Sequence, residues 1–194
     1  MSRGLGDVYK RQGDTSQKLT LMKTSADSLK KSADALNDSS LWEKKKIKKK
    51  DEKTGEEIEA EDYDWDKITK AVKSFVEDYN DVVKEAGESN TKDVLRNASW
   101  MTGMTDKNSN MLAKIGITIG KGNKLELDED ALKQADISSL KTVFTGYNSF
   151  VSKISQKATG ISNAANRASA TYTNNGMYSK TGFSLTSSKI DKEV

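Results

Sequence analysis

Residues 19–36 read LTLMKTSADSLKKSADAL, and apolar residues recur along this stretch at spacings of three and four. The apolar positions are Leu19, Met22, Ala26, Leu29, Ala33 and Leu36. This spacing is the repeat of a coiled-coil seam, in which one narrow apolar stripe runs along a helix. The sequence therefore predicts an N-terminal coiled-coil helix over residues 13–40, whose stripe must be buried against another element.

The same spacing returns further along the chain. A second helix is predicted over residues 65–86, because Gly87 is a common helix stop. A third helix is expected to start at residues 89–91 and to bend or break at Gly103 or in the polar stretch 105–110. A final helix is predicted from Ile137 to about Tyr172, with Tyr147 on its seam, and it would measure roughly 50 Å at ~1.5 Å per residue.

A charged β-hairpin is predicted over residues 41–65. Residues 44–50 read KKKIKKK, and residues 51–66 hold nine acidic residues against one Lys. A turn at Thr54-Gly55 would place Lys53 opposite Glu56, Lys50 opposite Glu59, Lys48 opposite Glu61 and Lys45 opposite Asp64. Because the acidic strand neutralises the lysines, we expect no nucleic-acid binding from this run.

A second hairpin is predicted over residues 116–128, which read GITIGKGNKLELD. Apolar and polar residues alternate on both sides of a glycine-rich turn, so that Ile117, Ile119, Leu125 and Leu127 can share one buried face. Asp128 is placed to cap a short helix that follows the second strand. The predicted fold class is thus mainly α (α+β), an elongated helical bundle or coiled coil with two β-hairpins.

The composition argues against an enzyme. The chain of 194 residues contains no Cys, no His and no Pro, which removes thiol nucleophiles, imidazole bases and the commonest transition-metal ligands. Carboxylate-only catalysis would need a cleft that aromatic residues, at 7%, are too few to line. We therefore expect no catalytic residue, no metal and no cofactor. No apolar run approaches the ~18 residues of a membrane span, and none marks a cleavable signal.

The two ends of the chain are expected to lie outside the fold. Residues 2–12, SRGLGDVYKRQ, resemble the translation of a sequencing adapter, so residues 1–12 are interpreted as an artefactual or disordered terminus. Residues 173–194 are rich in Ser, Thr, Asn and Lys, and they are predicted to form a disordered tail. The remaining residues 66–172 form the predicted helical domain that contains the second hairpin.

Three stretches resemble the C-terminal part of the flagellar filament cap, or hook-associated protein 2, family. They are residues 71–83 (AVKSFVEDYNDVV), residues 112–132 (LAKIGITIGKGNKLELDEDAL) and residues 143–146 (VFTG). The resemblance implies export through the flagellar channel without a cleaved signal, and a place at the filament tip where flagellin subunits add. Where that family carries a large insertion that forms the upper plate of the cap, residues 42–65 leave room for one hairpin only.

The leading functional hypothesis is a non-enzymatic, cap-like structural protein that associates with itself or with flagellar filament subunits through its terminal helices. Its predicted contact residues are Met22, Leu29, Leu36, Phe150, Ile154, Ile161, Ala164, Ala165 and Ala168. The alternative for the larger side chains is an intramolecular core in an antiparallel bundle. The competing functions are a small secreted coiled-coil factor and a cytoplasmic export chaperone, so the expected location is the extracellular flagellum or, alternatively, the cytoplasm.

Overall fold

The computed structural model describes residues 13–50 and 57–171, and it confirms the mainly α fold with two antiparallel hairpins. Both predicted termini and the Thr54-Gly55 turn lie outside the described residues. The elements, in chain order, are α1 (Ser16–Asn37), η1 (Ser39–Trp42), β1 (Lys45–Lys50), β2 (Glu57–Asp62), α2 (Trp65–Gly87), α3 (Lys92–Lys107), α4 (Ser109–Ala113), β3 (Ile117–Ile119), η2 (Lys121–Asn123), β4 (Leu125–Leu127), α5 (Glu129–Gln134), α6 (Ile137–Phe144) and α7 (Phe150–Thr171).

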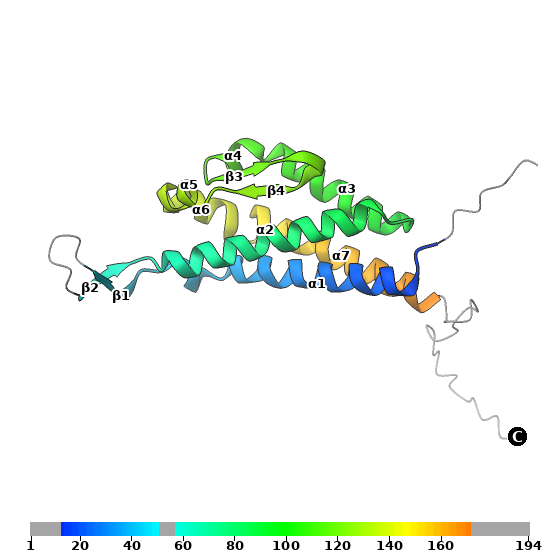
Figure 1. Cartoon of the computed structure of the whole chain (residues 1–194), viewed down its shortest axis with the longest axis horizontal. Helices are drawn as coiled ribbons and strands as arrows, with labels where there is room; N and C mark the ends of the chain where they lie inside the picture. The colour runs from blue at the N-terminus through cyan, green and yellow to red at the C-terminus, as the bar shows by residue number, and fades with distance from the viewer. Residues whose placement is uncertain (1–12, 51–56, 172–194) are drawn as a thin grey trace, which may run out of the picture.

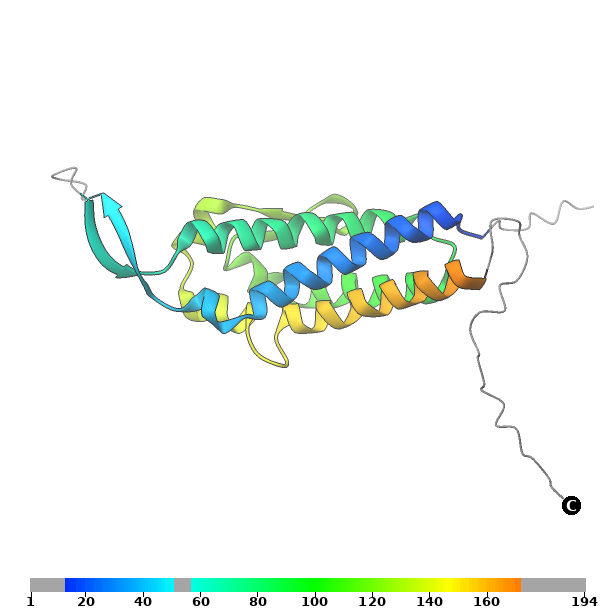
Figure 2. The ribbon, with the colours of Figure 1, turned by 90° about the horizontal axis from the view of Figure 1, so that it is seen from below.

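The molecule is an elongated bundle of long helices with a smaller layer on one side (Figure 1). Helix α1 lies between α2 and α7, and α3 packs against α7 and α2 (Figure 2). The layer that contains α4, the β3–β4 hairpin, α5 and α6 covers the other side of α2. The β1–β2 hairpin projects from one end of the bundle, and α1 begins and α7 ends at the opposite end.

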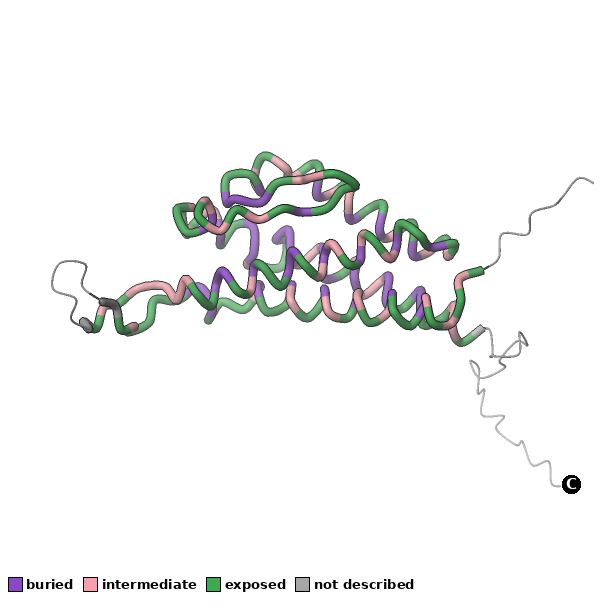
Figure 3. The backbone as a smooth tube through the Cα atoms, viewed as in Figure 1, coloured by how far each residue is buried: buried purple, intermediate pink, exposed green. Residues whose placement is uncertain are grey.

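A single apolar cluster runs through the bundle. It joins the stripes of α1, α2, α3 and α7 to the buried side of the smaller layer (Figure 3). All six seam residues of α1 are buried in it, which confirms the stripe predicted from the sequence. At the end near the charged hairpin, the Trp42 ring stacks on Phe144 with ring centroids 5.5 Å apart, and Phe75 packs edge-on against Phe144 and Phe150.

Acidic residues start three of the helices. The carboxylates of Asp64, Asp128 and Asp136 accept hydrogen bonds from backbone N–H groups in the first turns of α2, α5 and α6. These N–H groups have no partner inside their own helix, so the caps satisfy them. The capping role expected of Asp128 is confirmed.

The β3–β4 hairpin matches its prediction. Ile117 pairs with Leu127 and Ile119 with Leu125, and Ile117 and Leu125 are buried in the core. The side chain of Asn80, on α2, binds both backbone groups of Leu125: its Nδ2 donates to the carbonyl at 2.8 Å and its Oδ1 accepts from the N–H at 2.7 Å. Helix α2 thus satisfies the outer edge of β4 as a third strand would.

The register predicted for the charged hairpin is wrong by two residues. Lys50 pairs with Glu57, Lys48 with Glu59 and Lys46 with Glu61. The prediction assumed a two-residue turn at Thr54-Gly55, and the number of residues between two strands sets their register. The shift is even, so lysines still face glutamates, and Ile47 pairs with Ala60 on the other, half-buried face.

The long final helix is also contradicted. The chain leaves the helical conformation after Phe144 and resumes it at Phe150, so α6 and α7 are separate helices. Gly146 takes a φ of +97°, which favours glycine and is incompatible with a continuing α-helix. Tyr147, expected on the seam, is 83% exposed in this turn.

The third helix is interrupted where the polar stretch was predicted to interrupt it, and not at Gly103. Helix α3 runs through Gly103 and ends at Lys107, and α4 begins at Ser109. The Asn108 side chain donates to the Met104 carbonyl at 2.7 Å, which satisfies a carbonyl in the last turn of α3. The break therefore comes from side-chain capping of a helix end.

Candidate assembly surfaces

The structure places all nine predicted contact residues in or against the apolar core cluster of this chain, to which both α1 and α7 contribute. Eight of them are buried, and Ala168 is partly buried against the same cluster. In this conformation their side chains hold the two terminal helices together and do not face solvent. Contacts through them to a second chain therefore stay a prediction that requires α1 and α7 to separate first.

Two polar contacts fix how α1 and α7 align. The hydroxyl of Ser162 donates to Asp27 at 2.6 Å, and that of Ser155 donates to Asp34 at 2.7 Å. The two aspartates are seven residues apart on α1, and the two serines are seven residues apart on α7. The later aspartate binds the earlier serine, so the two contacts together fit one register of antiparallel helices. The sequence analysis missed them; the signal was the recurrence of Asp and Ser at heptad spacing beside each apolar stripe.

These two aspartates also bind lysines on their own helix. Lys23 contacts Asp27 and Lys30 contacts Asp34, each one turn away. Burial alone would raise the pKa of both carboxyls, but the hydrogen bonds from lysine and serine outweigh it, and the pKa of each lies below its usual value. Both aspartates therefore stay ionised at neutral pH and hold the α7 hydroxyls.

A second polar cluster ties the start of α1 to the turn between α2 and α3. The carboxylate of Asp14 accepts bonds from the Ser89 and Thr91 hydroxyls, at 2.7 Å each, and from the backbone N–H groups of Asn90 and Thr91. The Asp14 side chain is fully covered, and Lys18 lies 3.7 Å away. Asp14 thereby holds the two residues that precede α3, where the Thr91 side chain makes no cap to its own helix.

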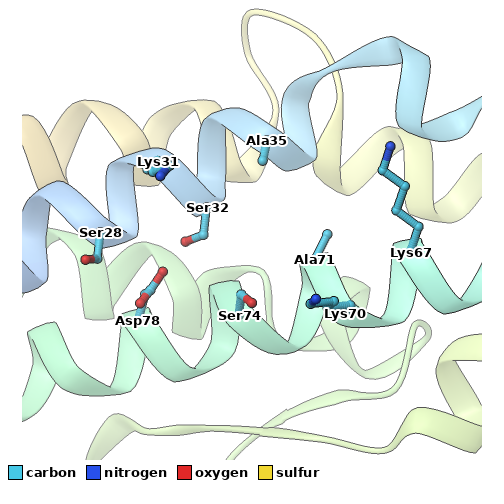
Figure 4. A pocket seen from close by; sticks show the side chains of 9 residues that line it. All are labelled: Ser28, Lys31, Ser32, Ala35, Lys67, Lys70, Ala71, Ser74 and Asp78. Atoms are coloured by element: carbon cyan, nitrogen blue, oxygen red, sulfur yellow. The ribbon is translucent and has the colours of Figure 1, made fainter.

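A groove of about 390 Å³ lies between α1 and α2. Figure 4 shows that small side chains, including Ser28, Ser32 and Ala71, line it and that Asp78 points toward Ser32. Burial raises the pKa of Asp78, and the neighbouring Asp81 and Glu77 raise it further. The lysines at its rim, Lys31, Lys67 and Lys70, project from both helices.

The outer face of α3 and α7 carries exposed aromatic and charged groups. The ammonium group of Lys157 lies 4.3 Å from the centre of the Trp100 ring, and Trp100 is 44% exposed. Arg167 and Asp93 form an ion pair of 3.5 Å across the same two helices. These contacts are on the surface, where an isolated ion pair contributes little to stability.

The described residues offer neither a metal site nor a membrane span. Within residues 13–50 and 57–171, no cluster of three or more acidic side chains could hold a metal ion. In the same ranges, no helix combines the length and apolar character that crossing a membrane requires.

A family model described as flagellar hook-associated protein 2 C-terminus matches residues 89–193, which is more than half of the chain. The chain belongs to this family. The matched part starts at the Asp14 cluster and includes every described element from α3 to α7. Neither the curated proteins nor the solved structures gave a significant match.

Two of the three stretches that resembled the hook-associated protein 2 family, residues 112–132 and 143–146, lie inside the match, and residues 71–83 precede it. The stretch 112–132 runs from the end of α4 through the β3–β4 hairpin into α5. In this member of the family, the matched helix α7 is covered by α1, which lies outside the match. The two parts share one core.

Proposed function

We propose that this protein is a non-enzymatic structural component of the bacterial flagellum with a filament-cap role. It acts outside the cell, reaches that place by export without a cleaved signal, and associates with copies of itself and with filament subunits. The observation that carries the proposal is the family match over residues 89–193, because it covers the most specific stretch of the sequence and more than half of the chain.

Two features of the fold support a structural role. The described body is a long bundle with one continuous apolar core, which suits a rigid building block. The polar clusters around Asp14 and between α1 and α7 connect helices to one another. Their carboxylate and hydroxyl groups form hydrogen bonds with each other across these contacts. They position one helix against another.

The proposal is tested by deleting the gene in the source bacterium and restoring it on a plasmid. We expect the deletion strain to shed unassembled filament protein into the medium and to carry short or missing filaments, and the plasmid to restore their length. Normal filaments in the deletion strain would overturn the proposal. Fractionation separates the competing functions: protein found only in the cytoplasm favours an export chaperone, and free protein in the medium without attachment to filaments favours a secreted factor.

A further inference from the structure

The charged hairpin, strands β1 and β2, extends away from the bundle. It projects beyond the ends of α1 and α2, with no other described element beside it (Figure 1). Lys46 and Lys48 of β1 and Glu59 and Glu61 of β2 are exposed and lie opposite one another. At these four positions the hairpin is therefore accessible to another molecule.

Among the residues that the structure describes, the sheet to which the hairpin belongs has two strands, so each strand is an edge of that sheet. The backbone of an edge strand can form hydrogen bonds with a further strand, and natural proteins usually block such edges by bulges, short strands, cover or charged side chains, especially lysines. Charged side chains block pairing with a strand of like charge, whereas opposite charges across two strands are favourable. Here both strands are six residues long and carry opposite charge: β1 reads KKIKKK and β2 reads EIEAED.

Charge decides which strands can pair between molecules. Two copies of β1 side by side would place lysines opposite lysines, and two copies of β2 would place acidic groups opposite each other; both arrangements are destabilising. Only β1 of one copy beside β2 of another repeats the Lys–Glu pairing that already holds the hairpin together. On the opposite face, Ile47 and Ala60 would continue an apolar row across the joined sheet.

We propose that the charged hairpin is a self-association surface, in which the free edge of β1 pairs with the free edge of β2 from a second copy of this chain. The contact is heterologous, because different strands meet, so it generates a ring if the rotation closes and an open chain if it does not. The proposal specifies the surface for the self-association in the proposed function, and it does not depend on the flagellar location.

A single edge contact of six residues is small, and its charged groups are exposed to solvent. We therefore expect association at concentrations of about 100 µM and above, and we expect it to weaken at high salt, because screening reduces interactions between exposed charges. Sedimentation velocity at low and high salt measures both properties on the full chain.

Two charge-reversed variants separate this surface from any other. The first carries Lys46→Glu and Lys48→Glu, so that the facing positions 46, 48, 59 and 61 are all acidic, and the second carries Glu59→Lys and Glu61→Lys, so that these four positions are all basic. We expect each variant alone to be monomeric and an equimolar mixture to associate as strongly as the wild type. A chain with all four substitutions, which restores opposite charges within one hairpin, should also associate.

Lys107→Glu with Lys114→Glu is the matched control, because both lysines are exposed on the body and the change in net charge equals that of the first variant. We expect this control to associate like the wild type. The proposal is overturned if the wild type stays monomeric at low salt, if either charge-reversed variant alone associates like the wild type, or if their mixture stays monomeric. Thermal melting of every variant checks that the bundle remains folded. If the association experiment fails but the deletion strain still loses its filaments, only the proposal for the charged hairpin is refuted, and the proposed function stands.

Discussion

Gly116 connects α4 to β3 in a conformation that a side chain would strain. Its φ is +78°, and a Cβ atom there would lie 2.6 Å from the Asp128 carbonyl oxygen and 2.9 Å from the Leu132 nitrogen. Both are backbone atoms, which cannot rotate away. We predict that Gly116→Ala lowers the free energy of unfolding by about 2 kcal/mol or more, measured by denaturant unfolding.

Gly103→Ala provides the matched control. Gly103 lies inside α3, and a Cβ atom there would meet nothing within 4 Å. Because alanine favours the helix, this substitution should raise the free energy of unfolding by about 0.5–1 kcal/mol. Equal effects of the two substitutions would show that the turn at Gly116 is not the strained position described.

The carboxyl group of Asp14 should make the free energy of unfolding depend on pH in the acidic range. Burial alone would raise the pKa of this carboxyl, but the bonds from Ser89, Asn90 and Thr91 outweigh it, and the folded pKa lies below 3.8. A carboxyl with a lowered pKa stabilises the fold above its unfolded pKa, and that contribution is lost as the pH falls through the folded value. We predict that Asp14→Ala lowers the free energy of unfolding by about 1–3 kcal/mol at pH 7. The difference in free energy of unfolding between this variant and the wild type should narrow below pH 3.8.

Asp78 should behave in the opposite way. Its raised pKa means that ionisation disfavours the folded state, so its unfavourable effect is absent at low pH and appears as the pH rises through the folded value. We predict that Asp78→Asn stabilises the protein at pH 7 and that the gain narrows on acidification, as measured by thermal melting at a series of pH values. A loss of stability at pH 7 would contradict the assigned environment.

At the level of elements, helix α7 is part of the folded body. Ile161 is buried with no exposed surface, whereas Asn163, two residues later, is exposed. We predict that Ile161→Asp unfolds the bundle, with a loss of about 3–5 kcal/mol, because it buries an unpaired charge. Asn163→Asp should change stability by less than about 0.5 kcal/mol. Melting of Ile161→Asp at the wild-type temperature would instead support α7 as a detachable surface.

The sequence allowed the elements to be predicted where local chemistry decides them. The stripe of α1, the alternation in β3 and β4, and the cap at Asp128 all follow from residues within one element. The break between α6 and α7 could not be recognised, because both helices bury apolar residues and the seam spacing continues through the turn at Gly146. Spacing shows where a side chain is buried relative to its own helix, and it does not show where the chain turns.

The partner of a stripe was likewise not predictable. The residues of α1 and α7 were correctly expected to be buried, but the same pattern suits an intramolecular core and a subunit contact. Whether a stripe packs within the chain or against another chain depends on contacts between residues more than a hundred positions apart in the sequence. Ser155 with Asp34 and Ser162 with Asp27 are two such contacts. The hairpin register had the same difficulty, because the length of its turn sets the pairing.

At the scale of the whole molecule, the two ends of the bundle differ. One end carries the charged hairpin, and at the other α1 begins and α7 ends. There the Asp14 cluster ties the start of α1 to the turn between α2 and α3. Such an elongated body, with a self-complementary hairpin at one end, can associate with its own copies at that end and leave the other end for a filament. We therefore expect the protein at the end of the filament and not along its side.

Immunogold electron microscopy of intact flagella tests this central claim most directly. Cells should carry the protein with an epitope tag inserted between residues 51 and 56, and the tagged gene must first be shown to restore filament length in the deletion strain. We expect gold particles at the distal tips of filaments and none along their sides. Labelling spread along the filaments, or confined to the cell interior, would contradict this expectation.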